Sequence, residues 1–496
     1  MSVCINSNST AACLTELAAL GAQDTLLTCD PKCSLFHQSY CRITNFAMGE
    51  QTLQFQGAPS GQNWSAATSL RAEAQRAGDL LGPVYLDFCV SGILEAVTLA
   101  NAPSLLASNI FMPAIGYGII EESKVVIGSQ EFESCTGEYF MMHDEISRAE
   151  GHRASKLIGD YGRYLRAAAC TAASDVPQLT DEETLQAALE FTSRSQKILA
   201  PLPHFWTKHP GNYLNVVGSQ YHNIVLELKT RAYSQLARLI STNETSGAIT
   251  RADATTPPPG QGVLSGMSLL AVYVQLDTAE RRLKAQAAQT VRFVYTQHAS
   301  YSTVSTDLGA TKQVSNYFNH PVARLVWAWR SQEAVAENEW FRFGAYAGRK
   351  VLRSVGLYQK QEVVPEISSF ELAINNNSRV HQAAEYFLYA QPYASAKRVP
   401  SRIVYSYSFA LYPESEDIHS GSLNLSRIDN VVAMFTFKPQ TAGATAAAAD
   451  SIASLVSSVS APTSAITIAG GAVLFNAETI NFYKQAAGMF GLLFAN

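Results

Sequence analysis

Apolar and polar residues alternate in many short stretches of this chain. Successive side chains of a strand point to opposite faces of a sheet, so alternation at a period of two predicts strands with unlike faces. The clearest stretches are Val84 to Val90, Val125 to Ile127, Ile224 to Leu228, Leu270 to Leu276, Leu325 to Arg330 and Tyr405 to Leu411. Pro413 is expected to end the last of them, because its ring nitrogen has no hydrogen to donate. The pattern predicts an all-β fold.

Helical spacing is confined to a few segments. Cys13, Leu14, Leu17, Ala18 and Ala22 predict a short amphipathic helix within residues 11–22. Two capping boxes, at 180–183 and 277–280, predict helices that run to about 191 and to about 289. Residues 138–159 have mixed helical character. These helices are expected to be insertions in loops between strands.

The length of the chain and one segment rich in proline and glycine predict two domains. A chain of 496 residues is too long for one ordinary core. The segment from Thr242 to Gly266 contains three consecutive prolines and several glycines, which is typical of a linker. The predicted division is an N-terminal arm at 1–24, a first β domain at 25–231, a linker at 232–266 and a second β domain at 267–496. Residues 441–463 form an Ala-rich segment of low complexity.

Composition and charge exclude several classes of protein. Hydrophobic residues make up 47% of the chain, which is typical of a globular protein that buries its cores. No Lys or Arg precedes Lys32, so we expect neither a secretory signal nor a basic arm that binds nucleic acid. The most apolar window, 93–120, is interrupted by Glu95 and Pro103 and is not expected to span a bilayer. The net charge is −5.

All eight cysteines lie in the first 170 residues. Cys29, Cys33 and Cys41 could be read as metal ligands with His37 between them, but no fourth ligand follows at the spacing of a zinc finger. A disulfide framework is not expected in a chain this long without a signal peptide. We therefore expect free thiols and no metal site.

The sequence contains no specific catalytic motif. No Gly-rich phosphate loop, HExxH or GxSxG occurs. His143, Asp144, Glu145 and His152 are expected on a solvated helix face. The acidic loop of Glu414, Glu416 and Asp417 could supply the carboxylate pair of a glycoside hydrolase, but such pairs usually come from separate elements. A carbohydrate-binding or glycoside-cleaving β-sandwich remains the alternative function, and no catalytic residue or cofactor is expected.

Six segments together resemble a known family. Five of them are GAQDTLL (21–27), TNFAMGEQ (44–51), RAGDLLGPVYL (76–86), FNHPVARLVWAWR (318–330) and QPYASAKRVPS (391–401). The sixth is the strand YSFAL with its acidic loop, followed by NLSRIDN (424–430). These segments, in this order, are similar to the major capsid proteins of the nucleocytoplasmic large DNA viruses, of the iridovirus and phycodnavirus kind.

This resemblance implies a fold, an assembly and a location. Each half of the chain would be an eight-stranded jelly roll, and three copies would form a pseudo-hexameric capsomer of an icosahedral shell. The implied partners are neighbouring capsomers, minor capsid proteins and penton proteins, and through minor proteins an inner viral membrane. The genome would lie beyond that membrane, without direct contact. The implied location is the virion, after assembly in the host cytoplasm.

Five residues are candidates for structural or assembly roles: Arg427, Asp429, Asn430, Pro321 and Trp327. Arg427 and Asp429 would share one face of an extended segment and neutralise each other or a neighbour, with Ile428 directed into the core. Removing one member of a buried pair costs about 3–5 kcal/mol, against about 0–1 kcal/mol for an exposed pair. Trp327 and Trp329 are two residues apart on one strand, a pattern more typical of a core than of a ligand shelf.

Deletion of residues 1–24 tests the role of the N-terminal segment. The segment has a polar start and one short helix, too little to fold alone, so we expect it to contact other capsomers or inner proteins. The truncated chain should form a soluble trimer that does not assemble into shells, as measured by native mass and electron microscopy. A truncated chain that fails to form trimers would place the segment in the core instead.

Overall fold

The computed structural model describes most of the chain. The described residues are 9–19, 30, 36, 40–57, 66–90, 108–147, 157–160, 196–242, 249–253, 264–286, 288–304, 309–315, 318–336, 338–347, 350–353, 356–359, 362–415, 418–438 and 470–494. The chain divides into two compact units, Met1–Asn45 and Phe46–Asn496. The helix predicted at 180–191 and the Ala-rich segment at 441–463 lie outside the described residues.

The first unit contains the helix α1 (Ser9–Ala18), within the segment where an amphipathic helix is predicted. It begins two residues earlier and ends four residues earlier than residues 11–22. Its leucines Leu14 and Leu17 are exposed. In the part of the chain that the structure describes, no helix has the length and apolar character needed to cross a membrane.

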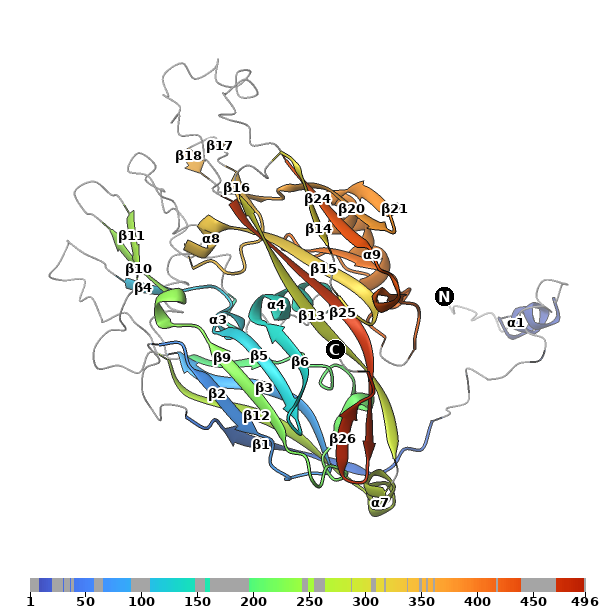
Figure 1. The fold of residues 1–496 in the computed structure, drawn as a ribbon. Helices are drawn as coiled ribbons and strands as arrows, with labels where there is room; N and C mark the ends of the chain where they lie inside the picture. The colour runs from blue at the N-terminus through green and yellow to red at the C-terminus, as the bar shows by residue number, and fades with distance from the viewer. Residues whose placement is uncertain are drawn as a thin grey trace, which may run out of the picture. The chain divides into compact units, whose positions relative to one another are not determined.

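The second unit begins with an eight-stranded antiparallel sandwich (Figure 1). One sheet, here called the β12 sheet, has the order β1-β12-β3-β7. Its strands are β1 (Phe46–Gln54), β12 (Leu264–Leu276), β3 (Leu80–Val90) and β7 (Gln196–Pro201). The facing β9 sheet has the order β2-β9-β5-β6. Its strands are β2 (Ser69–Glu73), β9 (Ile224–Thr230), β5 (Ile120–Ile127) and β6 (Gln130–Thr136).

A second sandwich follows with the same plan. Its β25 sheet has the order β13-β25-β15-β22, and its β24 sheet has the order β14-β24-β20-β21. The β25 sheet consists of β13 (Gln289–Val304), β25 (Gly470–Ala486), β15 (Pro321–Ser331) and β22 (Tyr405–Ser408). The β24 sheet consists of β14 (Thr311–Ser315), β24 (Val431–Phe437), β20 (Ile367–Ile374) and β21 (Asn377–Ala383).

Both sandwiches are jelly rolls. If the eight strands of each are lettered B to I in chain order, both pair as B-I-D-G and C-H-E-F, and the two domains match strand for strand. Their first and last strands are neighbours, so each domain closes by pairing segments that are distant in sequence. The predicted double jelly roll is confirmed.

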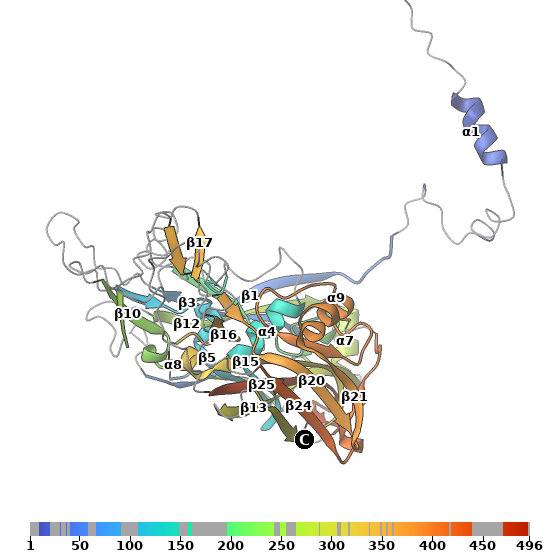
Figure 2. The same ribbon diagram turned by 90° about the horizontal axis from the view of Figure 1, so that it is seen from above.

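Smaller elements decorate the loops. The remaining strands are β4 (Ser108–Phe111), β8 (Leu214–Asn215), β10 (Ala237–Thr242), β11 (Ile249–Asp253), β16 (Ala345–Ala347), β17 (Lys350–Arg353), β18 (Gly356–Gln359), β19 (Glu362–Val364), β23 (Leu423–Asn424) and β26 (Met489–Leu492). The helices are α3 (Ile115–Gly118), α4 (Gly137–Ser147), α7 (Thr278–Gln286), α8 (Gln332–Ala336) and α9 (Gln391–Ala396), with the shorter turns η1 (Pro210–Asn212), η2 (Tyr233–Gln235), η4 (Tyr386–Ala390) and η5 (Leu425–Arg427). Figure 2 shows the same elements from above.

The boundary between the two jelly rolls differs from the one that composition predicts. The strand β12 pairs with β1 and β3 and so completes the first domain. The predicted linker at 232–266 contains β10 and β11, which pair with each other, and the first residues of β12. The connection to the second domain is α7, where the side chain of Asp277 accepts a hydrogen bond from the amide of Thr278 at 2.7 Å. The carbonyl of Asp277 accepts from the amide of Arg281 at 2.8 Å, so the helix starts where the sequence predicts, and it ends at Gln286 rather than near 289.

The strand β12 is apolar on both faces. Leu269, Ala271 and Tyr273 point into the first core, while Leu270 and Val272 lie on the opposite face and are only partly buried. The aliphatic alternation in the sequence therefore marks the outward face of the sheet, and the residues between those positions mark the core. A strand with two apolar faces is expected where both faces are covered.

The strand β22 ends at Ser408, earlier than the alternation predicts. The hydroxyl of Ser408 contacts both the amide and the carbonyl of Ala410, at 3.2 and 2.6 Å. The amides of Phe409 and Ala410 both donate to the carbonyl of Ala323. This local turn stops the ladder before Pro413 is reached.

The second core is built around Trp327. Its ring is fully buried and lies 4.3 Å from the ring of Phe370 and 5.9 Å from that of Tyr405, measured between centroids. Trp329 belongs to the same apolar cluster. The prediction that the tryptophan pair forms core is confirmed.

Replacing Trp327 tests this packing. Trp327→Ala should lower the free energy of unfolding by about 3–5 kcal/mol, because a fully buried aromatic side chain is lost and its cavity cannot fully collapse. Chemical denaturation measures the change. Tyr221→Ala is a useful comparison, since the side chain of Tyr221 is 73% exposed. An equal loss in both variants would contradict the central role of Trp327.

Candidate functional site at the seam between the jelly rolls

The helix α4 joins the two jelly rolls along a contact that we call the seam. It follows β6, and nine of its eleven residues are buried. A Cβ atom at its first residue, Gly137, would lie 2.3 Å from the carbonyl oxygen of Tyr117 and 2.4 Å from that of Ile120, so only glycine fits there. Asp144 and Glu145 are each 3% exposed, which corrects the prediction of a solvated face. The polar residues of α4 are enclosed because the second domain supplies partners for them. His152, which was predicted on the same face, lies outside the described residues.

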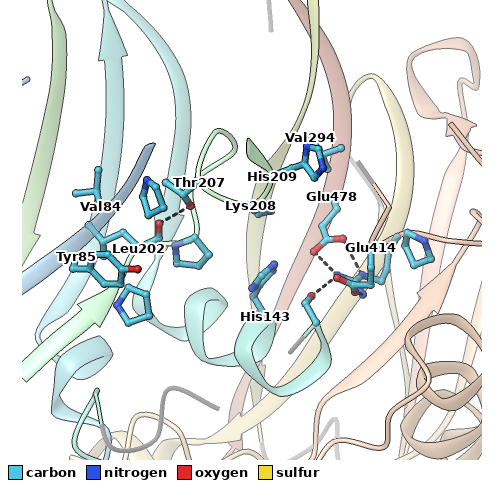
Figure 3. Close-up of a pocket in the computed structure, with 16 residues that line it drawn as sticks. Val84, Tyr85, His143, Leu202, Thr207, Lys208, His209, Val294, Glu414 and Glu478 are labelled. Atoms are coloured by element: carbon cyan, nitrogen blue, oxygen red, sulfur yellow. Dashed lines mark hydrogen bonds and ion pairs between the residues drawn. The ribbon is translucent and has the colours of Figure 1, made fainter. Parts of the chain in front are cut away.

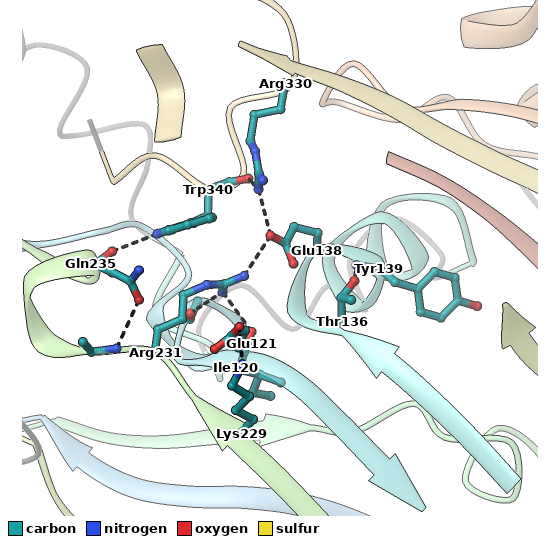
Figure 4. Close-up of polar contacts among 12 residues, drawn as sticks. Ile120, Glu121, Thr136, Glu138, Tyr139, Lys229, Arg231, Gln235, Arg330 and Trp340 are labelled. Atoms are coloured by element: carbon teal, nitrogen blue, oxygen red, sulfur yellow. Dashed lines mark hydrogen bonds and ion pairs between the residues drawn. The ribbon is translucent and has the colours of Figure 1, made fainter. Parts of the chain in front are cut away.

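The first group of partners gathers around Glu138 (Figure 4). Its carboxylate oxygen Oε1 accepts from Arg231 of the first domain and from Arg330 on β15 of the second, both at 2.8 Å. Both guanidinium groups also lie over the ring of Trp340, at 4.2 and 4.9 Å from its centroid. One carboxylate and one aromatic face thus hold two buried cations across the seam.

The charge state of Glu138 follows from this environment. Burial alone would raise its pKa, but the positive charges of Arg231 and Arg330 outweigh burial and lower the pKa to about 2. Because the pKa in the folded state lies below the ordinary value of 4.5, the carboxylate stabilises the fold fully above about pH 4.5. That contribution is lost only as the pH falls towards 2.

A second ionic group lies farther along the helix. Arg324 on β15 forms two hydrogen bonds of 2.8 Å with the carboxylate of Glu478 on β25, and its third nitrogen pairs with Glu414. It also donates to the hydroxyl of Ser147 at 3.0 Å, while Tyr139 donates to Glu478 at 2.9 Å. The charge of Arg324 outweighs the burial of Glu478 and lowers the pKa of its carboxyl to about 2. The two carboxylates in turn raise the pKa of Arg324 despite its burial.

The C-terminal half of α4 carries a third group. Glu145 accepts from the amide of Ser401 at 2.9 Å, and Arg402 lies 3.5 Å from the same carboxylate. Arg402 also pairs with Asp160 at 2.8 Å. Arg398 donates to the carbonyl of Asp144 at 3.1 Å. An acidic helix of one domain therefore faces arginines of the other.

Aromatic packing completes the seam. Phe205, in the loop after β7, lies 4.7 Å from the ring of Phe293 on β13, and Phe132 on β6 lies 6.2 Å from the same ring. Tyr483 on β25 packs against both Phe205 and Phe293. The apolar core of the first domain extends through these rings into the second, and also includes Val326 of β15.

A cavity of about 370 Å³ opens beside the second ionic group (Figure 3). Glu414 and Glu478 line one side, and Tyr85 lies across from them. A glycoside hydrolase needs a protonated carboxyl that gives its proton to the leaving group. The pKa of Glu478 is lowered to about 2, so this residue stays ionised near neutral pH and is unsuited to that role. Glu416 and Asp417 lie outside the described residues.

One cluster within the described residues has the composition of a metal site: Glu133, Cys135 and His204. Both ring nitrogens of His204 already have protein partners, with Glu133 at 3.0 Å and Ser123 at 2.9 Å. Burial, with the nearby Glu133 charge, raises the pKa of the Cys135 thiol. The cluster is best explained as a buried polar group of the first core, in which Glu133 and Ser123 hold the ring of His204.

The cysteines of the proposed zinc motif are only partly described. Cys41 is an exposed free thiol, whereas Cys29, Cys33 and His37 lie outside the described residues. Cys13, Cys89 and Cys135 are also free thiols.

Arg427 and Asp429 do not form the buried pair that their spacing suggests. Both side chains are exposed and, within the described residues, no ion pair joins them. Residues Leu425–Arg427 form the turn η5 rather than an extended segment, so the two side chains do not share a strand face. Ile428 does pack against the second core, as expected.

The other three candidates hold local structure. Asn430 donates to Asn376 at 3.2 Å, and its carbonyl accepts from the amide of Asn375 at 2.8 Å. Pro321 begins β15 and pairs with Asn424 of β23. Trp327 lies in the second core. None of the five lies in the seam.

The residues that do form the seam had a weak signal in the sequence. Arg324 and Arg330 interrupt the otherwise apolar strand β15, every residue of which from Val322 to Ser331 is buried. Glu478 is similarly the single charged residue between Gly470 and Tyr483 of β25. A single charge in a buried strand requires a partner, but the sequence does not show where that partner lies.

Comparison with known proteins gives consistent results. A family model described as "Major capsid protein N-terminus" matches residues 34–277, and one described as "Large eukaryotic DNA virus major capsid protein" matches residues 280–476. The two matches meet at the start of α7.

Curated proteins and solved structures that are similar to this chain are also major capsid proteins. The major capsid protein of Paramecium bursaria Chlorella virus 1 is 26% identical over 97% of this chain and 99% of its own length. That of Pyramimonas orientalis virus is 25% identical over 84% of this chain and 90% of its own length. The fold is similar to the PBCV-1 capsid structure, with a TM-score of 0.67, 23% identity and coverage of 93% and 100% of the two chains. The structure of the Faustovirus major capsid protein is also similar, with a TM-score of 0.61 and 12% identity. The match covers 95% of this chain and 96% of the Faustovirus chain.

Neutralising Glu138 tests the seam. Glu138→Gln should lower the free energy of unfolding by about 3–5 kcal/mol, because two buried arginines lose their shared counter-charge. The matched control is Asp429→Asn, an equally conservative change at an exposed carboxylate, which should change stability by no more than about 0.5 kcal/mol. Chemical denaturation at pH 7 measures both. Similar losses in the two variants would show that the seam does not depend on this charge.

Proposed function

This chain belongs to the major capsid proteins of large eukaryotic DNA viruses and is a structural subunit of their shell, and we propose a capsomer on that basis. The capsomer consists of three copies of the chain. The proposal is supported by the repeated fold: each chain has two jelly rolls, and their strand orders are the same. Three such chains supply six similar domains, which can surround an axis with a nearly hexagonal outline. Units of that outline tile the flat face of an icosahedron.

The partners follow from this role. We propose that capsomers contact one another, minor capsid proteins and penton proteins, and that minor proteins link them to an inner viral membrane. Assembly would take place in the host cytoplasm. The net charge of −5 supports a shell protein that does not bind the genome directly. Residues 1–24 would contribute contacts between capsomers.

We also propose that the protein has no enzymatic activity. The seam cavity offers the best place for a catalytic pair, and there Arg324 binds both Glu414 and Glu478. The pKa of Glu478 is lowered to about 2, so this carboxyl does not carry the proton that glycoside cleavage needs. The competing role of a carbohydrate enzyme is therefore less well supported.

The native mass of the purified protein tests the trimer. Light scattering should give close to three times the chain mass of 53.8 kDa. Negative-stain images should show hexagonal particles with a threefold axis. A protein that stays at the mass of one chain and cleaves glycans would overturn both proposals.

A further inference from the structure

The seam cavity has two unlike walls, one from each jelly roll. The first domain supplies a largely apolar wall at β3 and the end of β7: Pro83, Val84, Tyr85, Pro201 and Leu202. The second domain supplies an ionic wall of Arg324, Glu414 and Glu478. Figure 3 shows Tyr85 and Leu202 on one side of the cavity and the two glutamates on the other. A molecule in the cavity therefore contacts apolar surface and charged groups at the same time.

Backbone hydrogen bonds hold the apolar wall in place. Tyr85 stands opposite Pro201 in the ladder between β3 and β7. The amide of Leu202 donates to the carbonyl of Val84 at 3.0 Å, and the hydroxyl of Thr207 donates to the carbonyl of Leu202 at 2.9 Å. A wall fixed in this way loses little conformational freedom when a ligand binds, which favours affinity.

One carboxylate of the ionic wall can be reached from the cavity. The side chains of Arg324 and Glu478 are only 2% and 4% exposed, whereas that of Glu414 is 34% exposed. Arg324 binds one oxygen of Glu414, and the other oxygen accepts no hydrogen bond from the described residues. The ion pair fixes the position of this second oxygen, which can accept a hydrogen bond from a ligand.

The charges around the cavity cancel. Two of the charged residues that line it are positive, Lys208 and Arg324, and two are negative, Glu414 and Glu478. With the lining histidines counted as neutral, the sum is zero. A ligand with a net charge gains no overall attraction from these groups to offset the loss of its hydration. The cavity is therefore suited to a neutral ligand that has both hydrogen-bond donors and acceptors.

The size of the cavity limits the ligand further. Its volume of about 370 Å³ is near the lower end of the range of about 300–1,000 Å³ that is usual for small-molecule sites. One six-membered ring fits such a volume better than an extended chain does. A pyranose sugar is a ring of this size without net charge, with hydroxyl groups at its edge and C–H groups on its faces.

We propose that the seam cavity binds one neutral pyranose ring between the two jelly rolls. A C–H face of the sugar lies on the ring of Tyr85, because the face of an aromatic ring is electron-rich and attracts C–H groups. One hydroxyl group donates to Glu414, and another accepts from the ammonium group of Lys208. This site goes beyond the proposed role in the shell and does not depend on the number of copies in a capsomer.

The bound sugar is retained rather than cleaved. Burial alone would raise the pKa of Glu478, but the charge of Arg324 lowers it to about 2. This carboxyl therefore has no proton to give to a leaving group near neutral pH. Because the ligand contacts both domains, its binding also stabilises the contact between them.

Saturation-transfer NMR on the wild-type protein tests the site. The probes are the methyl glycosides of glucose, galactose and mannose, and at least one of them should receive magnetisation from the protein. Tyr85→Ala removes the aromatic face and should weaken binding about tenfold, because the ring contact and its buried area are lost. Tyr85→Phe keeps the ring and should bind as the wild type does. Tyr221→Ala is the matched control, since Tyr221 is exposed and is not among the residues that line the cavity.

Glu414→Gln tests the ionic wall independently. The variant keeps the size of the side chain but replaces a charge-assisted hydrogen bond with a weaker neutral one, so the affinity should also fall about tenfold. Circular dichroism shows whether each variant is folded, and Glu414→Gln decides the question if Tyr85→Ala is not. Acetate and putrescine serve as charged probes, and neither should bind as tightly as the best glycoside.

Three results would overturn the inference. In the first, none of the glycosides binds the wild-type protein. In the second, acetate or putrescine binds more tightly than every glycoside, which contradicts the argument from charge balance. In the third, a glycoside binds equally well to the wild type, Tyr85→Ala and Glu414→Gln, which places its site elsewhere. A protein that cleaves the glycosides would instead contradict the proposed absence of enzymatic activity.

Discussion

The burial of acidic side chains along α4 is the constraint on which the rest of the structure depends. A helix that carries Glu138, Asp144 and Glu145 can be enclosed only where opposite charges and hydrogen-bond donors meet it, since an unpaired charge in the interior is costly. The second domain brings arginines to these positions. The two jelly rolls are therefore held in one relative orientation, because sliding either of them would leave charges buried without partners.

Apolar packing and ion pairs contribute differently to this seam. The rings of Phe132, Phe205 and Phe293 remove apolar surface from water, which supplies most of the favourable free energy but tolerates small shifts. The hydrogen bonds that cross the seam, from Tyr139 to Glu478 and from Arg330 to Glu138, have strict geometry and tolerate little displacement. Both carboxyls with pKa values near 2 remain ionised over the whole range in which the protein is expected to function.

The sequence by itself determined the local elements. Alternation identified β3, β5, β9 and β15, the capping residue Asp277 marked the start of α7, and Trp327 was recognised as core. These features depend on neighbours within a few residues, and the family resemblance supplied the double jelly roll. Only the tertiary structure decided that β12 closes the first domain, that α4 is buried, and that Arg427 and Asp429 are exposed. The pairing of β1 with β12 and of Glu138 with Arg330 joins residues about 200 positions apart, and which distant residues meet depends on the packing of whole domains rather than on any local pattern.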